Sequence, residues 1–464
     1  MSKRMIINGF SQNAAAEHSF GQWKDDGDRH RDYKSPDYWI RLAQLLESGC
    51  FDAMMFADVH GLYDKYEDKA EHPVRHAVQF PGNDPTVLAP MLAQATDHIG
   101  IICTYSTTFF SPFHAAKLFS SLDHYTYGRI GWNIVTGYLD SAYRNGLGER
   151  LEHDERYDRA DEYMDVVYQL WENSWDEDAV VFDHATNTHT DPAKVYKIQH
   201  SGKYFQVEGP HMCEPSPQRT PFLVQAGGSS RGTAFAGRHA EAVFTVNTST
   251  VTGAATSKRI REAAAKEGRD PESIKILAAI TTVVDETDEA ARAKFERYQA
   301  NGEVDGTLAL FGGWTGVDLA GFAPEDKMAA FESQGMQHIA GMFGSIDDER
   351  DWTFEEMCEY MKVSSLMPVL VGSPQTVANE LERWMDEADI DGFNLISVQS
   401  PADFEDFVEL VVPELQRRGR MRTSYDDEGP TLRELVSGPG EKRLSEDHPM
   451  RRIVDTYSRE PISG

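Results

Sequence analysis

The fold is decided by residues 128–142, which read Gly128-Arg129-Ile130-Gly131-Trp132-Asn133-Ile134-Val135-Thr136-Gly137-Tyr138-Leu139-Asp140-Ser141-Ala142. Ile130 to Val135 is apolar enough to cross a buried core, and a polar loop containing a glycine follows it directly. Asn133 and Thr136 place hydrogen-bonding groups near the carboxyl end of this strand. Ligands of parallel α/β proteins bind at that end of the strands. The segment therefore predicts a buried parallel strand that leads into a binding site.

Seven other apolar runs have the same character. They are Met5 to Phe10, Phe51 to Ala57, Ile99 to Thr104, Pro221 to Ala226, Ala242 to Asn247, Ile274 to Val284 and Gly392 to Val398. Helical patterns lie between and after the strands, at Tyr38 to Ser48, Pro85 to Asp97, His114 to Tyr125, Tyr157 to Trp171, Arg231 to His239, Thr256 to Glu267, Asp288 to Gln299, Thr376 to Glu387 and Phe404 to Arg417. Eight repeats with nearly continuous apolar strands predict an α/β protein with a closed (β/α)8 TIM barrel. An open doubly wound sheet is the alternative.

Three connections are too long for a plain barrel, and they follow strands 2, 4 and 7 at residues 58–84, 172–220 and 301–372. In the second, residues 202–207 predict a small hairpin, and the third is a candidate lid over the strand ends. We therefore expect a single barrel domain with insertions over residues 1–423. The charged residues 424–464 contain proline and glycine, and they predict an extended C-terminal tail that packs on a subunit or stays mobile.

The composition restricts the class of protein. With 40% hydrophobic and 11% aromatic residues, the chain of 464 residues can bury a large core. Its formal charge of −31 argues against nucleic acid or an anionic membrane as a partner. Four scattered cysteines favour a reducing compartment, and the N-terminal apolar run is too short for a secretory signal or a membrane span. These features predict a cytoplasmic globular protein.

Polar residues at or near the ends of three neighbouring strands indicate a ligand site. Asp58 follows the second strand, and Thr104 and Asn133 hold corresponding positions on the third and fourth. Any one of them, taken alone, is explained equally well by a hydrogen bond to its own loop. Three at one rim of a barrel predict a polar ligand.

Two further motifs fit such a ligand. His153 and Tyr157 are four residues apart, so a helix places them on one face, where they can clamp a ligand. The segment 227–232 reads Gly-Gly-Ser-Ser-Arg-Gly between the fifth strand and the next helix. Its backbone amides, the hydroxyls of Ser229 and Ser230, and Arg231 predict an anion site suited to phosphate. A serine N-cap after a tight turn is the simpler explanation of the same residues.

No motif predicts a metal ion or a nucleotide loop. The chain contains neither G-x-G-x-x-G after a strand nor a Walker lysine loop, and H-E-x-x-H is also missing. His72 and His76 have the spacing of metal ligands, but Pro73 is expected to disrupt a helix there, and no cluster of carboxylates or cysteines completes the set. We therefore predict no metal site.

Long motifs nevertheless make the chain similar to a known family. It resembles the flavin-dependent monooxygenases of the bacterial-luciferase-like superfamily, in the group of nitrilotriacetate, dibenzothiophene-sulfone, dimethyl-sulfide and long-chain alkane monooxygenases. The resemblance extends from Ile6 to about Arg420. The segments that carry it are residues 51–58, 128–142, 153–158, 214–221 and 391–395.

The resemblance implies a barrel that binds FMN as FMNH2, supplied by a separate NAD(P)H-dependent flavin reductase. O2 would be captured at the flavin C4a position as a peroxide, and a small organic substrate would be oxidised, with cleavage of a C–S or C–N bond in one version of the reaction. A homodimer or homotetramer fits the family. The flavin contacts implied on matching positions are Asp58, Thr104, Asn133, His153, Tyr157, Ser229 and Ser230, with the serines at the phosphate.

The candidate catalytic residues are Asn133, His153 and Tyr138. One departure concerns the substrate, because alkane-like members have Asn-Cys-x-x-His after the first strand, where this chain has no cysteine and places its histidine at 18. Two more are Tyr138 and Phe311, which stand where the alkane-like member has histidine, so long-chain alkane activity is not expected. The candidate substrate cavity consists of Tyr63, Gln79, Tyr138, Phe311 and Trp314, for each of which core packing is the competing explanation.

Two other functions remain open. A deazaflavin-dependent oxidoreductase would use the same barrel and differ in the cofactor that supports turnover. A flavin-binding protein without catalysis would have a filled cavity above the flavin.

Overall fold

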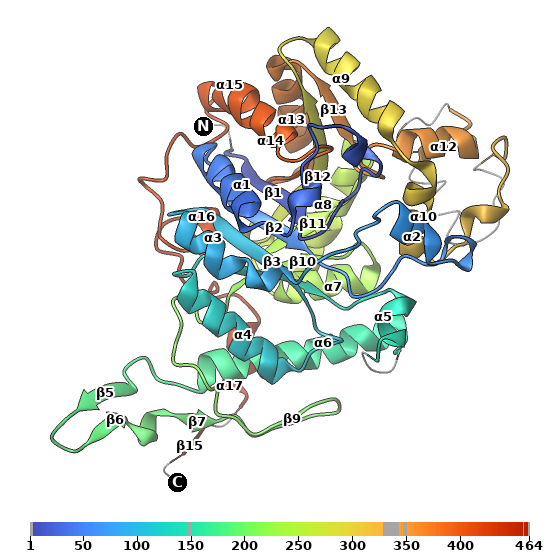
Figure 1. Ribbon diagram of the computed structural model, residues 1–464. Coiled ribbons are helices and arrows are strands. Elements are labelled where there is room, and N and C mark those ends of the chain that lie inside the picture. Colours follow the sequence, from blue (N-terminus) through green and yellow to red (C-terminus); the bar gives the residue numbers. More distant parts are fainter. Residues whose placement is uncertain are drawn as a thin grey trace.

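Eight parallel strands form a closed barrel that helices surround (Figure 1). The computed structural model describes residues 3–146, 150–327, 343–344, 346, 350–457 and 459–462. In chain order the barrel strands are β1 (Ile6–Gln12), β2 (Ala53–Ala57), β3 (Gly100–Ser106), β4 (Ile130–Val135), β10 (Phe222–Ala226), β11 (Ala242–Thr245), β12 (Lys275–Val284) and β14 (Gly392–Ile396). All eight predicted strands are therefore confirmed.

The pairing of strands closes the ring. β11 pairs with β12, with Ala242 opposite Lys275, and β1 pairs with β14, with Ile6 opposite Gly392. Each barrel strand thus has a neighbour on both sides, which an open sheet would not give its edge strands. The TIM barrel is confirmed, and the doubly wound alternative is wrong.

A ninth parallel strand extends the sheet outside the ring. β13 (Val369–Gly372) pairs with the last four residues of β12, starting at Thr281, the residue where the pairing with β14 ends. The sequence prediction placed these residues within or at the edge of the third insertion and missed the strand. A run of four residues is too short for its pattern to reveal a strand.

The predicted helices form a layer around the strands. Helices over the predicted segments are α1 (Pro36–Ser48), α3 (Ala89–Ala95), α4 (Pro112–Tyr125), α6 (His153–Tyr168), α7 (Ser230–His239), α8 (Thr250–Lys266), α9 (Asp288–Asn301), α13 (Pro374–Ala388), α14 (Ala402–Asp406) and α15 (Val412–Arg417). β4 contacts this layer through Trp132, whose ring centroid lies 5.2 Å from that of Phe119 of α4 and 6.2 Å from that of Trp171. Because side chains alternate along a strand, Asn133 then faces the barrel interior.

The first insertion contains a short helix, α2 (Glu71–Arg75), where disruption by proline was expected. Pro73 is the third residue of α2. The N–H groups of the first turn have no partner within the helix, so proline removes no hydrogen bond there. The expected disruption is therefore wrong, and His72 and His76 lie one helical turn apart.

The other two insertions are partly regular. In the second, β8 (His200–Ser201) and β9 (Gln206–Val207) form the predicted hairpin, and β5 (Val180–Asp183) pairs with β6 (Thr188–Thr190) in another that was not predicted. The third contains α10 (Val304–Thr315) and α12 (Phe354–Met361). The expected lid falls in part on residues 328–342 and 347–349, which lie outside the described residues.

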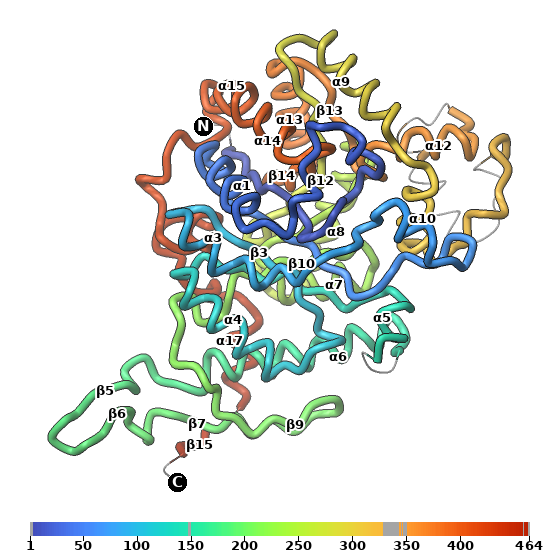
Figure 2. The backbone as a smooth tube through the Cα atoms, viewed as in Figure 1, coloured from blue at the N-terminus to red at the C-terminus, as the bar shows by residue number. Residues whose placement is uncertain are grey.

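The C-terminal segment does not form the extended tail that was predicted. It contains α16 (Leu432–Ser437) and α17 (Met450–Asp455), and β15 (Glu460–Pro461) pairs with β7 (Tyr196–Lys197) of the second insertion. Figure 2 shows this red segment running beside the barrel toward that insertion. Leu432 is fully buried within the apolar cluster of the barrel interior. The segment therefore packs on its own chain.

Leu432 closes the amino-terminal end of the barrel. A Cβ atom added to Gly100 or Gly131 would lie 2.4 Å or 3.0 Å from a methyl carbon of Leu432. These two glycines in β3 and β4 thus make room for a side chain from the far end of the sequence.

Among the described residues, the helices are too short or too polar to span a membrane.

Candidate active site

A cavity of about 340 Å³ opens at the carboxyl ends of the barrel strands. It extends from the loop after β2 across β4 to the turn before α7. Four of the seven predicted flavin contacts line it, namely Asp58, His153, Tyr157 and Ser229. The apolar part of the wall includes Phe109, Leu139 and Ala142. The structure thus gathers residues from five separate segments of the sequence at one concave site, as is typical of ligand sites in such barrels.

Asp58, at the wall of this cavity, has a carboxyl group whose pKa lies near neutral pH. Burial raises its pKa from 3.8 to about 7, and the negative charge of Asp84 acts in the same direction. The backbone N–H of Val59 donates to Asp58 Oδ1 at 2.9 Å and opposes the shift. A group with this pKa exchanges its proton at neutral pH.

Thr104 and Asn133 form a hydrogen-bonded pair inside the barrel, and both are buried. The Thr104 hydroxyl donates to the carbonyl of Phe56 and accepts from Asn133 Nδ2, each at 2.8 Å. Asn133 Oδ1 is buried and has no hydrogen-bond partner among the described residues. Buried polar atoms nearly always have a partner, so this oxygen is a candidate acceptor for a ligand.

His153 and Tyr157 lie together on α6, as their spacing predicted. Their ring centroids are 5.3 Å apart. Burial raises the pKa of Tyr157, and its hydroxyl lies within hydrogen-bonding reach of the Ser229 and Thr136 side chains. His153 is half-exposed, and its Nδ1 lies 2.8 Å from Asp154 Oδ1. Tyr157 therefore fixes one side of the cavity, while His153 stands at the opening.

The turn before α7 separates its two serines. Ser229 is the N-cap of α7, where its hydroxyl accepts from the Gly232 N–H at 3.0 Å, and it lines the cavity. Ser230 instead lines a groove between α7 and α8. Only one of the two predicted serines therefore belongs to the site, because consecutive residues at a helix start point in different directions.

Arg231 does not complete the anion site as expected. Its guanidinium donates to Asp158 at 2.9 Å and to Asp161 at 2.5 Å, both on α6. Two carboxylates already neutralise its charge. The positive potential at this turn comes instead from the N-terminus of α7.

Four of the five predicted substrate residues form one connected group. Tyr63 donates to Gln79 Oε1 at 2.7 Å, and its hydroxyl lies 2.8 Å from that of Tyr138. Trp314 packs against the apolar cluster that contains Tyr63. Because the Tyr63 hydroxyl donates its proton to Gln79, the hydrogen bond between the two tyrosines must be donated by the Tyr138 hydroxyl. Tyr138 also lines the main cavity and is 44% exposed, which places this group beside the candidate ligand site.

Phe311 is not part of this group. It is buried in an apolar cluster with residues such as Leu308 and Met357, which joins α10 to α12 and against which Trp314 also packs. Its packing fits the competing explanation, and its role as a cavity residue stays a prediction.

Two histidines near the site were not predicted as site residues. His60 Nδ1 lies 3.7 Å from Asp58 Oδ2, and burial lowers the pKa of His60. His60 lies in the loop that follows β2, and position after a barrel strand is what identified Asp58 as a candidate site residue. His18 is buried, with its ring 5.8 Å from that of Trp314, and burial lowers its pKa to about 4. It is therefore a neutral imidazole at physiological pH.

The chain is similar in sequence and in fold to known proteins. The sequence pattern of the family described as luciferase-like monooxygenase matches residues 17–391. A dimethyl-sulfide monooxygenase from Hyphomicrobium sulfonivorans is 42% identical over 98% of this chain and 95% of its own. A long-chain alkane monooxygenase from Geobacillus thermodenitrificans (strain NG80-2) is 45% identical over 97% of each chain. The crystal structure of a riboflavin lyase with modified FMN and riboflavin superposes with a TM-score of 0.89 at 32% identity, over 97% of this chain and 99% of that one.

Proposed function

The chain belongs to the luciferase-like monooxygenase family, whose members are flavin-dependent monooxygenases, and we propose that it is the oxygenase component of a two-component system. In this proposal a separate NAD(P)H-dependent flavin reductase supplies reduced FMN. With O2, the enzyme then oxidises a small organic substrate. The observation that carries the proposal is the convergence of Asp58, His153, Tyr157 and Ser229 on one cavity at the N-terminus of α7.

The turn before α7 fits the phosphate of FMN. Ser229 and Tyr157 bring two hydroxyls together, and the helix start adds backbone N–H groups and the positive end of its dipole. A dianion needs no further cation when several such donors surround it. His153, at the opening, would contact the flavin from the solvent side.

The side-chain amide of Asn133, in the barrel interior, fits the polar edge of the flavin ring. Asn133 Oδ1 is the buried acceptor without a partner among the described residues, and the flavin ring carries an N–H that can donate to it. Thr104 holds the Nδ2 end of the same amide, so the oxygen keeps its orientation. This would align the ring between the barrel interior and the cavity wall.

When bound, reduced FMN supplies the electrons with which O2 is activated. The protein's own contribution is to exclude water and to handle a proton. Phe109, Leu139 and Ala142 make part of the cavity wall apolar. Asp58, with its pKa of about 7, would accept or release a proton at its carboxylate during turnover.

We place the substrate beside the hydroxyls of Tyr63 and Tyr138. These hydroxyls and Gln79 can hydrogen-bond a polar substrate, whereas an alkane cannot use them. We therefore propose a compound that is oxidised at or beside a sulfur or nitrogen atom, after which the C–S or C–N bond breaks. The name of the dimethyl-sulfide relative supports this class.

The test is a substrate panel with the purified chain, FMN, NADH and a flavin reductase. Sulfides, sulfones, aminopolycarboxylates and alkanes are compared by oxygen uptake and product mass. We expect uptake that depends on both the reductase and a sulfur or nitrogen compound. Turnover with NADH in the absence of reductase would refute the two-component proposal.

Cofactor variants distinguish the remaining functions. Ser229→Ala should weaken binding of FMNH2 by about 10-fold, whereas its neighbour Ser230→Ala, outside the cavity, should change it less than twofold. Reduced deazaflavin that supports turnover better than FMNH2 would favour the deazaflavin-dependent enzyme. Tight flavin binding with no substrate oxidised across the panel would favour a non-catalytic flavin-binding protein.

A further inference from the structure

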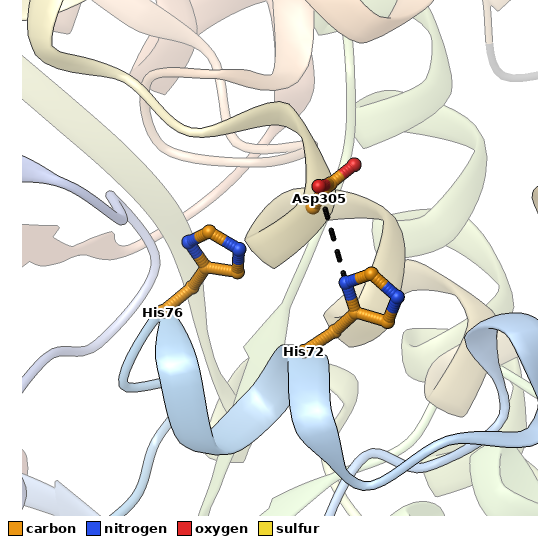
Figure 3. Close-up of side chains that lie close together, drawn as sticks. All are labelled: His72, His76 and Asp305. Atoms are coloured by element: carbon orange, nitrogen blue, oxygen red, sulfur yellow. Dashed lines mark ion pairs between the residues drawn. The ribbon is translucent and has the colours of Figure 1, made fainter.

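A cluster of two histidines and one aspartate lies where the first and third insertions meet. Figure 3 shows His72 and His76 extending from α2 on the same side, with Asp305 of α10 facing them. One donor atom from each residue lies within 4.8 Å of the other two. The proposed function uses none of them. We propose that these side chains bind a divalent transition-metal ion that clamps α2 to α10.

The donor set has the chemistry of such a site. Imidazole nitrogens and a carboxylate oxygen suit Zn²⁺ and Co²⁺, and three protein ligands leave one position for water. Metal–ligand bonds of about 2.0–2.2 Å require these donors to move toward a common centre by distances on the order of 1 Å. Asp305 is half-exposed, so its rotamer can adapt, and an ion can enter from solvent on its side.

A carboxylate behind His72 fixes which ring nitrogen is free. His72 Nε2 lies 3.1 Å from Glu67 Oε2, and its proton is donated to that carboxylate. The lone pair is then on Nδ1, the atom that faces Asp305 at 3.9 Å. Histidines that bind metals commonly donate their other N–H to a carboxylate in this way.

His76 supplies an independent observation. Its Nε2 atom is buried and has no hydrogen-bond partner among the described residues. A buried nitrogen without a partner is costly, and coordination to an ion would satisfy it. The other ring nitrogen, Nδ1, lies 3.8 Å from Glu303 Oε2, so a second carboxylate stands near the cluster.

The backbone is adapted to bring the two helices together. A Cβ atom at Gly306 would lie 3.0 Å from Cβ of His76, closer than nearly all such contacts. Glycine at this position therefore lets α10 approach α2, and the preceding residue, Asp305, is carried to the histidines.

The location gives the ion a consequence for the candidate substrate group. Tyr63 and Gln79 flank α2 in the sequence, and Trp314 lies in α10. An ion between α2 and α10 would hold the two insertions that carry these side chains in one relative position.

The experiment is metal binding by the full chain after treatment with a chelator. Competition with a chromophoric zinc indicator should reveal one tightly bound Zn²⁺ per chain, and Co²⁺ should give the visible absorption of a low-symmetry site with nitrogen ligands. His76→Ala and Asp305→Asn should each weaken binding by about 100-fold. Glu67→Gln removes only the partner of His72 and should weaken it by about 10-fold.

His189→Ala is the matched control, because it removes an exposed histidine from the β5–β6 hairpin. It should leave the affinity and the Co²⁺ spectrum unchanged. Thermal unfolding without metal checks that each variant is folded, and Asp305→Asn alters a half-exposed side chain that folding tolerates. The proposal is overturned if the wild type binds no stoichiometric ion, or if His76→Ala and Asp305→Asn bind as the wild type does.

Discussion

Arg433 and Asn133 are buried polar side chains toward opposite ends of the barrel, and they differ in how fully the protein satisfies them. At the amino-terminal end, the guanidinium of Arg433 donates to both carboxylate oxygens of Glu241, at 2.6 and 3.0 Å, and to the carbonyls of Thr220 and Pro221. At the carboxyl-terminal end, Asn133 Oδ1 is buried with no partner among the described residues. The guanidinium of Arg433 thus has its partners within the chain, whereas the Asn133 amide oxygen is open to a hydrogen bond from the proposed ligand.

We expect the two side chains to contribute differently, the first to stability and the second to ligand binding. A buried ion pair with complete hydrogen bonding holds a structure in one arrangement, and its loss is destabilising. Unmatched donors and acceptors lower stability but are available to a ligand. We therefore expect variants at the amino-terminal end to affect unfolding most, and those at the carboxyl-terminal end to affect flavin binding and pH dependence.

The largest effect should follow Arg433→Ala. The change leaves Glu241 buried without its cation, and we expect a loss of about 3–5 kcal/mol in the free energy of unfolding, measured by denaturant titration. Arg443→Ala is the control, since Arg443 and its partner Glu177 are both solvent-accessible and their pair contributes about 0–1 kcal/mol. Equal losses in the two variants would contradict the contrast between buried and exposed pairs.

Leu432→Ala tests the closure of the same end by packing. Removing this side chain leaves a cavity between β3 and β4, and we expect a loss of about 3 kcal/mol in the free energy of unfolding. Val251→Ala truncates an apolar side chain that is 76% exposed and should change it by less than about 0.5 kcal/mol. A loss below 1 kcal/mol for Leu432→Ala would show that the barrel is complete without the C-terminal segment.

Asp58→Asn should change how stability depends on pH. The folded chain keeps the Asp58 proton up to a pKa of about 7, while the unfolded chain loses it near 4. The stability that this proton confers is full below pH 4 and is lost as the pH rises through 7. The variant escapes this loss, so its advantage over the wild type should be larger at pH 8 than at pH 5 by on the order of 2 kcal/mol.

Denaturant titrations at the two pH values measure this difference. The exposed Asp427→Asn is the control and should behave as the wild type at both. An Asp58→Asn variant whose stability tracks the wild type from pH 5 to pH 8 would show that Asp58 ionises normally.

Tyr157→Phe should have the smallest effect, and we expect it to change flavin binding but not the free energy of unfolding. It removes one hydroxyl at the proposed phosphate position, so the dissociation constant of FMNH2, measured anaerobically, should rise about 5- to 10-fold. Tyr125→Phe, on a ring that is 64% exposed, should leave it unchanged. An unchanged constant for Tyr157→Phe would move the phosphate away from this turn.

The barrel could be predicted from sequence because each strand carries its own apolar signal. The parts that were missed lack such a signal. β13 has four residues, and α16 has a capping box at Thr431 and Glu434 but only six residues, too few for a helical period to be recognised. The prediction of an extended tail failed for this reason.

Site residues were predictable where their position along a strand or helix determines the direction in which the side chain points. Asp58 and Tyr157 are of this kind, and Ser229 follows from the helix start. Arg231 was misjudged because its counterions lie on another helix, α6. Asp305 escaped notice because it approaches His76 only through tertiary packing.

The position of Leu432 also sets the order of events during synthesis. The side chain that completes the barrel interior is made after all eight barrel strands, as the chain leaves the ribosome from its N-terminus. Contacts so distant in sequence form slowly, because long loops must close first. Until Leu432 has been made, the amino-terminal end of the barrel interior lacks the side chain that fills it.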